Sequence, residues 1–555
     1  MALQKRDKEF RLSKISYLDF KFTEMDRVLT NLFSRIQHQG YPSRLRQSHE
    51  NTVALFVEHF VSQPTKFKGF SDRPDVVSRW VATHLMDLVN RGKAEPKVAA
   101  PRPLHGYTYR FRNPHHCRDY GSSQQIYEML HHARDGRGDI ALQRLKSFFF
   151  EGIDPNTQEY DPAVEVDVET QALLALTQRD VVQDTPDTSN REQYPPLCIG
   201  AADLMADDLV RLLVYKKHIP RSVMVDYLKV LFSFHLALYH LRLLKLLPAL
   251  VRKRGGEPAC AMNRCQLDPK KDDYPQGDCP YRIGLLLDVA NRPGTHMARL
   301  AEQSADLHYR RIPSFVKAYF VTKKLDEFGL NLLMQGKLLG GPDRRLTVAQ
   351  VLGLLENTYD AERDIFFGMR LASLIENAVD QSGELDPRLK EIGEMGLGKL
   401  DAYIESVVAF RAKFQRDYLV ECLDSLLLKN KPGALLAQTR KRGAPRRFIL
   451  DSRLLEVLLQ IAVLKIAGEG PLGYQTEEIR VEDLLLFLRE RYGLYIDRLP
   501  PGEGFDEASI EDREALRNNK QGFKSKLREI GFFQDLSDAY ITQHVTPRYR
   551  IIAQK

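Results

Sequence analysis

The sequence predicts a mainly α protein built from several domains. Apolar residues recur at helical spacing through most of the 555 residues. The composition, with 43% hydrophobic and 28% charged residues, is that of a globular chain. A chain of this length is expected to hold about two to four domains. A helix followed by a short hairpin pattern closes the chain.

Residues 1–150 predict a mostly helical N-terminal domain. Helical patterns cover Thr23–Gln37, His49–Ser62, Pro74–Asn90 and Gln124–Phe150. Between the last two, Tyr107–Phe111 alternates aromatic and polar residues, which is typical of a strand.

Residues 151–200 predict an acidic linker. Glu151–Leu197 contains eleven Asp and Glu residues against two Arg. Its second half, Arg179–Pro196, has little apolar surface to bury, so we expect an exposed loop there.

Residues 201–435 predict an all-α body with a cysteine-containing loop at 254–282. Leucines within Leu204–Leu213 mark one helix, Val223–Leu250 marks a long second helix, and helical patterns continue from Tyr281 to Asn430. The long helix is the most apolar stretch of the chain, but four polar side chains interrupt it: His235, His240, Arg242 and Lys245. It therefore predicts a buried helix and not a membrane span. The polar N-terminus and the six cysteines indicate a cytoplasmic protein.

Residues 448–555 predict a C-terminal winged helix-turn-helix module. Leu454–Ile466 and Val481–Tyr492 are apolar helical segments, and Asn518–Ile530 predicts a third helix that stops at Gly531. Aromatic and β-branched residues then flank an Asp/Ser turn between Phe532 and Val545, which predicts a hairpin. A helix with a hairpin behind it is how winged helices meet DNA.

The third helix of this module has two stripes. Leu516, Phe523, Leu527 and Ile530 follow at spacings of 7, 4 and 3 and share one apolar side. A second, mostly basic stripe at spacings of 4, 3 and 4 predicts the nucleic-acid contact: Arg517, Gln521, Lys524 and Arg528. Further candidates lie near the wing, at Arg548 and Arg550, and in a basic arm before the module, at Arg440, Lys441 and Arg442.

Two other interpretations of these basic residues stay open. Each basic group also fits an ordinary solvated surface, and winged helices also serve as adaptors between proteins. The net charge of +7 is small for this length, so charge alone does not identify a nucleic-acid binder.

The cysteine-containing loop predicts a possible metal site. Cys260, Cys265 and Cys279 lie within twenty residues in a polar segment. Cys198 is the first candidate for a fourth ligand, and Cys117 beside His115 and His116, or His296, are the alternatives. Thiolates bind zinc or iron-sulfur clusters, so zinc, a cluster and ordinary thiols are the three alternatives. The spacing contains no CxxC pair, which makes the pattern weakly specific.

No catalytic motif stands out, so the sequence predicts a protein that is not an enzyme. Phosphate-binding loops, nucleophile elbows, zinc-protease helices and dinucleotide fingerprints are all missing. Asp75 followed by Glu95 and Lys97 weakly resembles the PD…ExK motif of metal-dependent nucleases, but Pro96 lies between Glu95 and Lys97. This is the least favoured alternative.

Three segments together resemble accessory proteins of bacterial anti-phage operons: His218–Pro248, the cysteine-containing loop and Asn518–Ile551. The chain looks most like an accessory component of the methylation-associated defence system, whose operon also encodes methyltransferase, specificity, nuclease and ATPase proteins. The resemblance extends over about two thirds of the chain and carries no site residue. It implies a cytoplasmic bacterial protein that helps to restrict foreign DNA.

These observations lead to one expected function and one main alternative. The chain is expected to be a non-catalytic, DNA-associated subunit of a restriction-like defence complex, with DNA and proteins of the same operon as partners. Neither a membrane nor a small-molecule substrate is expected. The alternative is an assembly adaptor that binds methyltransferase or ATPase partners without touching DNA.

Overall fold

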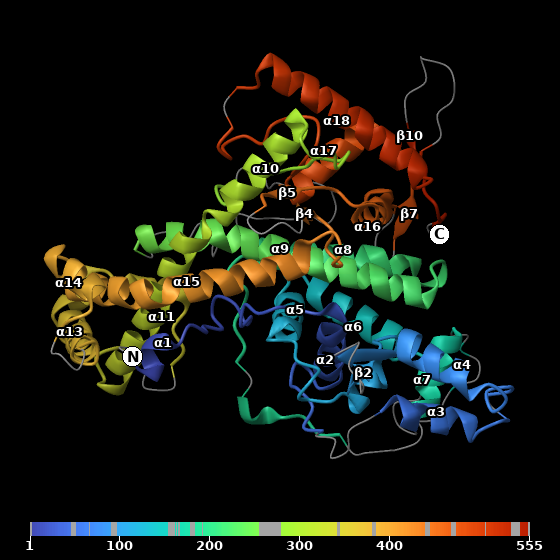
Figure 1. Cartoon of the computed structure of the whole chain (residues 1–555), viewed down its shortest axis with the longest axis horizontal. Helices are drawn as coiled ribbons and strands as arrows, with labels where there is room; N and C mark the ends of the chain where they lie inside the picture. The colour runs from blue at the N-terminus through green and yellow to red at the C-terminus, as the bar shows by residue number, and fades with distance from the viewer. Residues whose placement is uncertain are drawn as a thin grey trace.

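The protein is mainly helical, as predicted, and Figure 1 shows its helices gathered into three regions around a group of long central helices. The structure is a computed structural model. It describes residues 3–45, 52–65, 67–89, 97–153, 161, 164, 167–177, 184–190, 192–254, 279–340, 344–379, 384–438, 444–467, 473–505, 507–533 and 544–552. Among these residues the strands form five two-stranded sheets and no larger one.

The N-terminal region packs helices around a small hairpin. The short helix α1 (Lys5–Lys8) precedes it, and its helices are α2 (Met25–Gln37), α3 (Val53–Val61), α4 (Pro74–Trp80), α5 (Ser122–His131) and α6 (Arg137–Phe149). The hairpin pairs β1 (Met86–Val89) with β2 (Lys97–Pro101) in antiparallel register. The predicted helices are present, but the one expected to reach Asn90 gives way to β1.

The strand predicted at Tyr107–Phe111 is wrong, because Gly106–Phe111 forms a 3-10 helix. Its N-terminus is capped by the His105 ring, which accepts a hydrogen bond from the Tyr107 backbone N–H at 3.3 Å. Thr108 is buried along with its aromatic neighbours, so both faces of the segment pack inward. The aromatic and polar residues alternate in this segment, but they do not form one buried face and one exposed face, as a surface strand would.

Part of the predicted acidic linker is packed against the N-terminal region. It contains a helix, α7 (Val168–Thr177). The Asp184 carboxylate, 4% exposed, accepts hydrogen bonds from His38 Nε2 at 2.7 Å and from Ser43 Oγ at 2.6 Å. Asp184 was expected in an exposed loop, but it is buried, and these hydrogen bonds offset the cost of burying its carboxylate.

Long helices form the centre of the molecule. They are α8 (Ile199–Leu213), α9 (Arg221–Arg252), α11 (Ile312–Met334) and α15 (Lys399–Leu427). In the described part of the chain, α9 is the one helix long and apolar enough to cross a bilayer, and 94% of its most apolar window is buried inside the protein. His235 and His240 on α9 are also buried, and each has a hydrogen-bond partner, Asp208 and Ser16 respectively, at 2.9 Å. The prediction of a buried core helix is confirmed.

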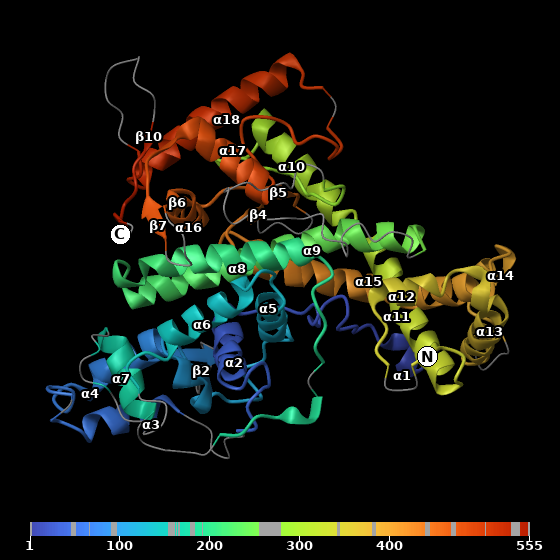
Figure 2. The same cartoon turned by 180° about the vertical axis from the view of Figure 1, so that it is seen from behind.

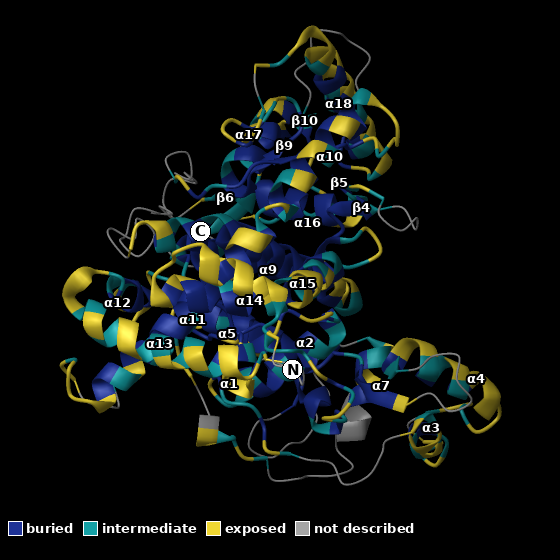
Figure 3. Cartoon of the chain, turned by 60° about the vertical axis from the view of Figure 1, so that its left-hand side comes forward, coloured by how far each residue is buried: buried dark blue, intermediate teal, exposed yellow. Residues whose placement is uncertain are grey.

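One end of the central helices carries a small group of helices, seen at the left of Figure 1. It contains α12 (Val348–Gly353), α13 (Asp360–Glu376) and α14 (Pro387–Glu394). Figure 3 shows much exposed surface on α13 and α14.

The C-terminal region lies on the side of the central helices opposite the N-terminal region, as Figures 1 and 2 show. Its helices are α10 (His296–Tyr309), α16 (Ser452–Ala462), α17 (Val481–Tyr492) and α18 (Ile510–Glu529). Its strands are β3 (Leu285–Leu286), β4 (Leu436–Gln438), β5 (Arg446–Phe448), β6 (Leu464–Ile466), β7 (Tyr474–Thr476), β8 (Ile479–Arg480), β9 (Leu494–Tyr495) and β10 (His544–Val545). Pairs β4–β5, β6–β7 and β8–β10 are antiparallel, whereas β3–β9 is parallel. The β3–β9 pair joins a segment before α10 to the segment after α17.

A close approach of two backbones makes a glycine necessary after α17. Gly493 has φ +75°, and a Cβ built there would lie 2.1 Å from the Ile283 carbonyl oxygen. The left-handed conformation and the missing side chain both favour glycine. It ends α17 and lets β9 align beside β3.

Candidate nucleic-acid interface

The helix that carries the predicted basic stripe, α18, has well-defined ends. Ser509 and Asp512 form a capping box, in which the Ser509 hydroxyl accepts from the Asp512 backbone N–H at 3.1 Å. The helix therefore starts earlier than the predicted Asn518. At the other end Gly531 has φ +76°, and its N–H donates to the Arg528 carbonyl at 3.0 Å. The predicted stop at Gly531 is confirmed.

One side of α18 is fixed in the protein. Leu516, Phe523 and Leu527 are buried, as the spacing predicted. Between them Asn519, 2% exposed, uses its whole amide: it accepts from the Val289 backbone N–H at 2.9 Å and donates to the Leu287 and Ile496 carbonyls at 2.8 Å. Asn519 thus clamps α18 to the ends of β3 and β9. The sequence reading missed this residue, and its only local signal was a polar position inside an apolar stripe.

The predicted basic stripe lies on the other side of α18. Arg517, Gln521 and Arg528 are exposed and Lys524 is half-buried. The Arg528 guanidinium lies 5.2 Å from the centre of the Phe533 ring. Within the described residues, Arg517 and Lys524 have no ion-pair partner. The stripe therefore presents cationic groups to solvent.

Two neighbouring lysines of α18 have structural partners and differ from the stripe. Lys520 pairs with Glu482 at the start of α17 at 2.7 Å. Lys526 donates to the Leu450 carbonyl oxygen, and burial lowers its pKa. Only part of the positive charge on α18 is therefore available to an outside partner.

The other predicted basic contacts fall in different settings. Arg548 donates to the Ile530 carbonyl at 2.6 Å and lies 4.6 Å from the Phe532 ring centre, so it holds the end of α18. Arg550 is exposed. Arg440, Lys441 and Arg442 lie outside the described residues. Beside them, Arg446 pairs with Asp424 at 2.6 Å and Arg447 with Asp288 at 3.1 Å.

A short antiparallel strand arrangement follows α18. Val545 of β10 pairs with Ile479 of β8, and it also forms a single bridge to Phe533 just after α18. The tip of the predicted hairpin, residues 534–543, lies outside the described residues. Figure 2 shows β10 at the end of α18 and near β7.

A cleft of about 650 Å³ opens between α18 and the start of α10. Asn518, Gln521 and Ser525 line it from α18, and Arg292 and Arg299 line it from the opposite side. At its edge His296 Nε2 lies 2.6 Å from the Asp512 carboxylate, which ties the first turns of the two helices together. The cleft thus places amide and hydroxyl groups directly beside the basic stripe.

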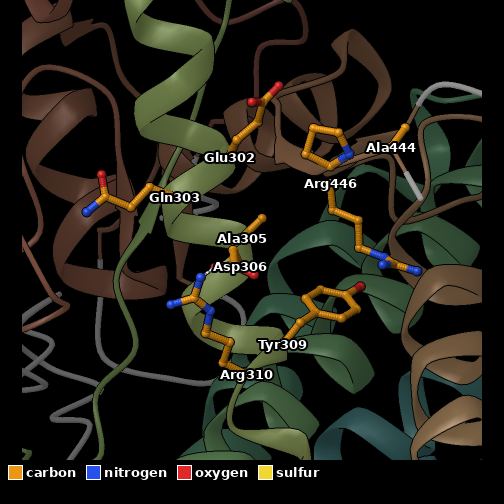
Figure 4. Close-up of a pocket in the computed structure, with 9 residues that line it drawn as sticks. Glu302, Gln303, Ala305, Asp306, Tyr309, Arg310, Ala444 and Arg446 are labelled. Atoms are coloured by element: carbon orange, nitrogen blue, oxygen red, sulfur yellow. Dashed lines mark ion pairs between the residues drawn. The ribbon is translucent and has the colours of Figure 1, made fainter.

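A second pocket, of about 470 Å³, lies farther along α10, toward its C-terminal end (Figure 4). Its charged groups already pair with each other or with neighbours: Arg310 with Asp306 at 2.5 Å and Arg446 with Asp424 at 2.6 Å. The Arg446 guanidinium also lies 4.7 Å from the Tyr309 ring centre. Because these charges are compensated, we assign no ligand to this pocket.

A comparison with protein families decides which family the chain represents. The family model described as methylation-associated defense system protein MAD7 matches residues 5–549. The chain belongs to this family. The resemblance to the methylation-associated defence system is thereby confirmed, and other proteins of that system are the partners it suggests. No curated protein and no solved structure matches the chain.

The cysteines proposed as metal ligands in this MAD7-family protein are only partly described. Cys260 and Cys265 lie outside the described residues. Cys279 is half-buried before β3, and Cys198, 1% exposed, precedes α8 with its Sγ 3.5 Å from the Arg242 guanidinium. No group of three His, Cys, Asp or Glu side chains suited to a metal ion occurs among the described residues. The zinc and iron-sulfur alternatives stay predictions.

The residues of the least favoured nuclease alternative are also only partly described. Asp75 is exposed in the first turn of α4 and pairs with Arg73 at 3.3 Å. Lys97 begins β2, and Glu95 lies outside the described residues. Nothing in this arrangement favours a nuclease centre.

Proposed function

We propose that this MAD7-family protein is a non-catalytic, cytoplasmic subunit of a bacterial defence complex, and that it contacts duplex DNA through α18. The observation that carries the proposal is the stripe of Arg517, Gln521, Lys524 and Arg528, in which all but the half-buried Lys524 are exposed, on a helix whose opposite side is clamped by Asn519. A rigid helix whose cationic groups lie on one solvent-facing side can enter a groove without reorganising. The other proteins of the system would supply catalysis.

The strand pattern supports a winged-helix interpretation of this region. α16, α17 and α18 are the three helices, and β10 with Phe533 forms the base of the hairpin after the third helix. β8, between the first and second helices, pairs with β10 and closes the small sheet. In this interpretation α18 is the recognition helix.

The chemistry of the stripe divides the contacts into two kinds. Arg517, Lys524 and Arg528 suit phosphate oxygens, which bind cations without regard to sequence. Gln521 and Asn518 carry amides that both donate and accept, as base edges require, and both line the cleft next to α10. The stripe would give affinity, and the cleft side would give preference for particular bases.

A salt titration of DNA binding tests the proposal. In the Lys524→Glu/Arg528→Glu variant, duplex binding should weaken by about tenfold or more. The negative slope of the logarithm of the association constant against the logarithm of salt concentration should become less steep by about 2. Lys413→Glu/Arg416→Glu on α15 makes the same change of charge at two exposed positions far along the chain from the stripe and serves as the control. Unchanged binding by the α18 variant, or equal weakening by both variants, would contradict DNA contact through α18.

An assembly adaptor that does not touch DNA is the second candidate. Membership of a defence-system family favours partner proteins, and winged helices also bind proteins. Co-purification with system proteins, together with no DNA shift even at low salt, would favour this alternative over DNA contact.

A further inference from the structure

The outer face of α13 carries an apolar stripe that nothing in the described chain covers. Ala361, Ile365, Met369 and Ala372 follow at spacings of 4, 4 and 3, which places them along one side of the helix. Ile365 and Met369 are each 64% exposed, and both alanines are exposed. Single exposed apolar residues are ordinary, but a continuous stripe on one helix marks a contact surface.

The stripe is not needed to hold α13 in the fold. The inner side of the helix buries Phe367 and Leu374. The Phe367 ring lies 5.9 Å from that of Phe328 on α11 and 5.7 Å from that of Tyr403 on α15. Because a complete inner face already anchors α13, the outer apolar residues add nothing to its packing.

Two further exposed apolar side chains lie at the same end of the protein as α13. A Cβ built at Gly368, next to the stripe, would lie 3.9 Å from Cγ of Lys399, the first residue of α15. Met395 and Leu397, just before α15, are 54% and 38% exposed. Figures 1 and 3 show α13 and α14 at the same end of the molecule. The stripe and these two side chains therefore belong to one end of the protein.

The charges of α13 are divided between its two sides. Its arginines are turned inward and paired, Arg370 with Glu327 and Arg363 with Asp360. The acidic residues on the outer side are Glu362, Asp364 and Glu376. Among the described residues Glu362 pairs with Lys337 at 2.9 Å, and Asp364 and Glu376 have no ion-pair partner. Asp364 and Glu376 therefore make the border of the apolar stripe acidic on α13 itself, while Lys399 of α15 lies near Gly368.

We propose that the outer face of α13 binds an amphipathic helix of another protein of the same defence system, with lysines or arginines beside its apolar stripe. A straight helix face with side chains four residues apart fits the ridges of a second helix. The acidic border selects a basic partner. A second copy of this chain docking through α13 would place acidic residues against acidic residues, which disfavours self-association.

This surface is separate from the proposed DNA contact. α13 lies at one end of the central helices, and α18 lies on the far side of the C-terminal region (Figures 1 and 2). A protein that binds DNA with α18 and a partner with α13 could hold both at once. The inference stands on the α13 face alone and does not depend on DNA binding.

Binding measurements with purified partners test the α13 surface. The probes are the methyltransferase, specificity, nuclease and ATPase proteins expected in the same system, each purified separately and titrated against the full chain. One of them should bind, and Ile365→Gln/Met369→Gln should weaken its affinity by about tenfold or more. Ile510→Gln, at an 84% exposed isoleucine on α18, is the matched control and should leave the affinity unchanged.

A charge change and a crosslink make the test specific. Asp364→Lys should weaken binding most at low salt, because the acidic border attracts a basic helix. A photoreactive amino acid at position 369 should crosslink to a basic amphipathic helix of the bound protein. Crosslinks only between copies of this chain, binding by none of the four probes, or equal affinity of the wild type and the glutamine variant would each overturn the proposal.

Discussion

The guanidinium of Arg491 on α17 is fully buried and bonds to the carboxylate of Asp208 on α8, with Nε 2.8 Å from Oδ1. Nη2 of Arg491 donates to the Asp207 carboxylate at 2.6 Å, and Arg211 pairs with the Asp207 carboxylate at 2.9 Å. Burial alone would raise the pKa of Asp207, but the two arginines lower it to about 2. This cluster joins the C-terminal region to the central helices.

Arg491→Met should destabilise the protein strongly. Removing one partner leaves the Asp208 carboxylate buried without its cation, which costs about 3–5 kcal/mol. Arg480→Met is the control, because Arg480, at the end of β8 just before the same helix, is exposed and pairs with Asp483. Its loss should change the free energy of unfolding by less than about 1 kcal/mol. Chemical denaturation measures both, and similar effects of the two variants would contradict a special role for the buried cluster.

Asn519→Leu should release α18 from its support. The substitution leaves the Val289 N–H and the Leu287 and Ile496 carbonyls without their partner, and each buried unpaired group costs about 1–3 kcal/mol. The neighbouring Asn518 is exposed, so Asn518→Leu is a matched control that should leave stability nearly unchanged. Thermal unfolding compares the two, and equal melting temperatures would contradict the clamp.

Helical spacing predicted the stripes of α18 correctly, because burial of one side of a helix needs only local periodicity. The same spacing could not reveal Asn519, whose partners at Leu287 and Ile496 are distant in sequence or lie in a loop. The parallel pair β3–β9 was missed for a similar reason: each strand has two residues, too few for any pattern.

The error at Tyr107–Phe111 has a different physical origin. Alternation predicts a strand only if one face is buried and the other exposed, and here Thr108 is buried as well. At Asp184 the opposite error occurred, because a residue expected to be exposed is buried. An acidic residue in a polar segment gives no sign that His38 and Ser43 will donate hydrogen bonds to its carboxylate. Composition identified the segment as acidic but not its anchor point.

The cysteine-containing loop is predicted to hold zinc through Cys260, Cys265, Cys279 and Cys198. Protein purified without chelators should contain about one zinc ion per chain, and Cys260→Ser/Cys265→Ser should lose it. Cys422→Ala is the control, since Cys422 is buried within α15, away from the loop in the sequence. Elemental analysis decides the matter: iron with visible absorption would indicate the cluster alternative, and absence of both metals would leave ordinary thiols.

Two buried histidines predict that stability falls in mild acid. His240 Nδ1 donates to the Leu236 carbonyl at 2.7 Å, and its Nε2 lies 2.9 Å from the Ser16 hydroxyl. His308 Nε2 donates to the Gly284 carbonyl at 3.1 Å, and its Nδ1 faces the Arg311 guanidinium at 3.0 Å. Burial lowers the pKa of each ring to about 4, and Arg311 adds to the effect at His308. Both rings are therefore neutral in the folded protein at neutral pH.

The sign of the pH dependence follows from these lowered pKa values. Above about pH 7.5 almost no proton is bound at these rings in either state, so the two histidines should add no pH dependence to stability there. Between pH 6.5 and about 4 the unfolded histidines take up protons that the folded ones do not bind, so the free energy of unfolding should fall with a slope that approaches about 1.4 kcal/mol per histidine for each pH unit in the middle of this range. Chemical denaturation at pH 7.5, 6 and 5 measures the slope, and His240→Gln should reduce it. A variant with the wild-type slope would contradict a neutral, buried His240.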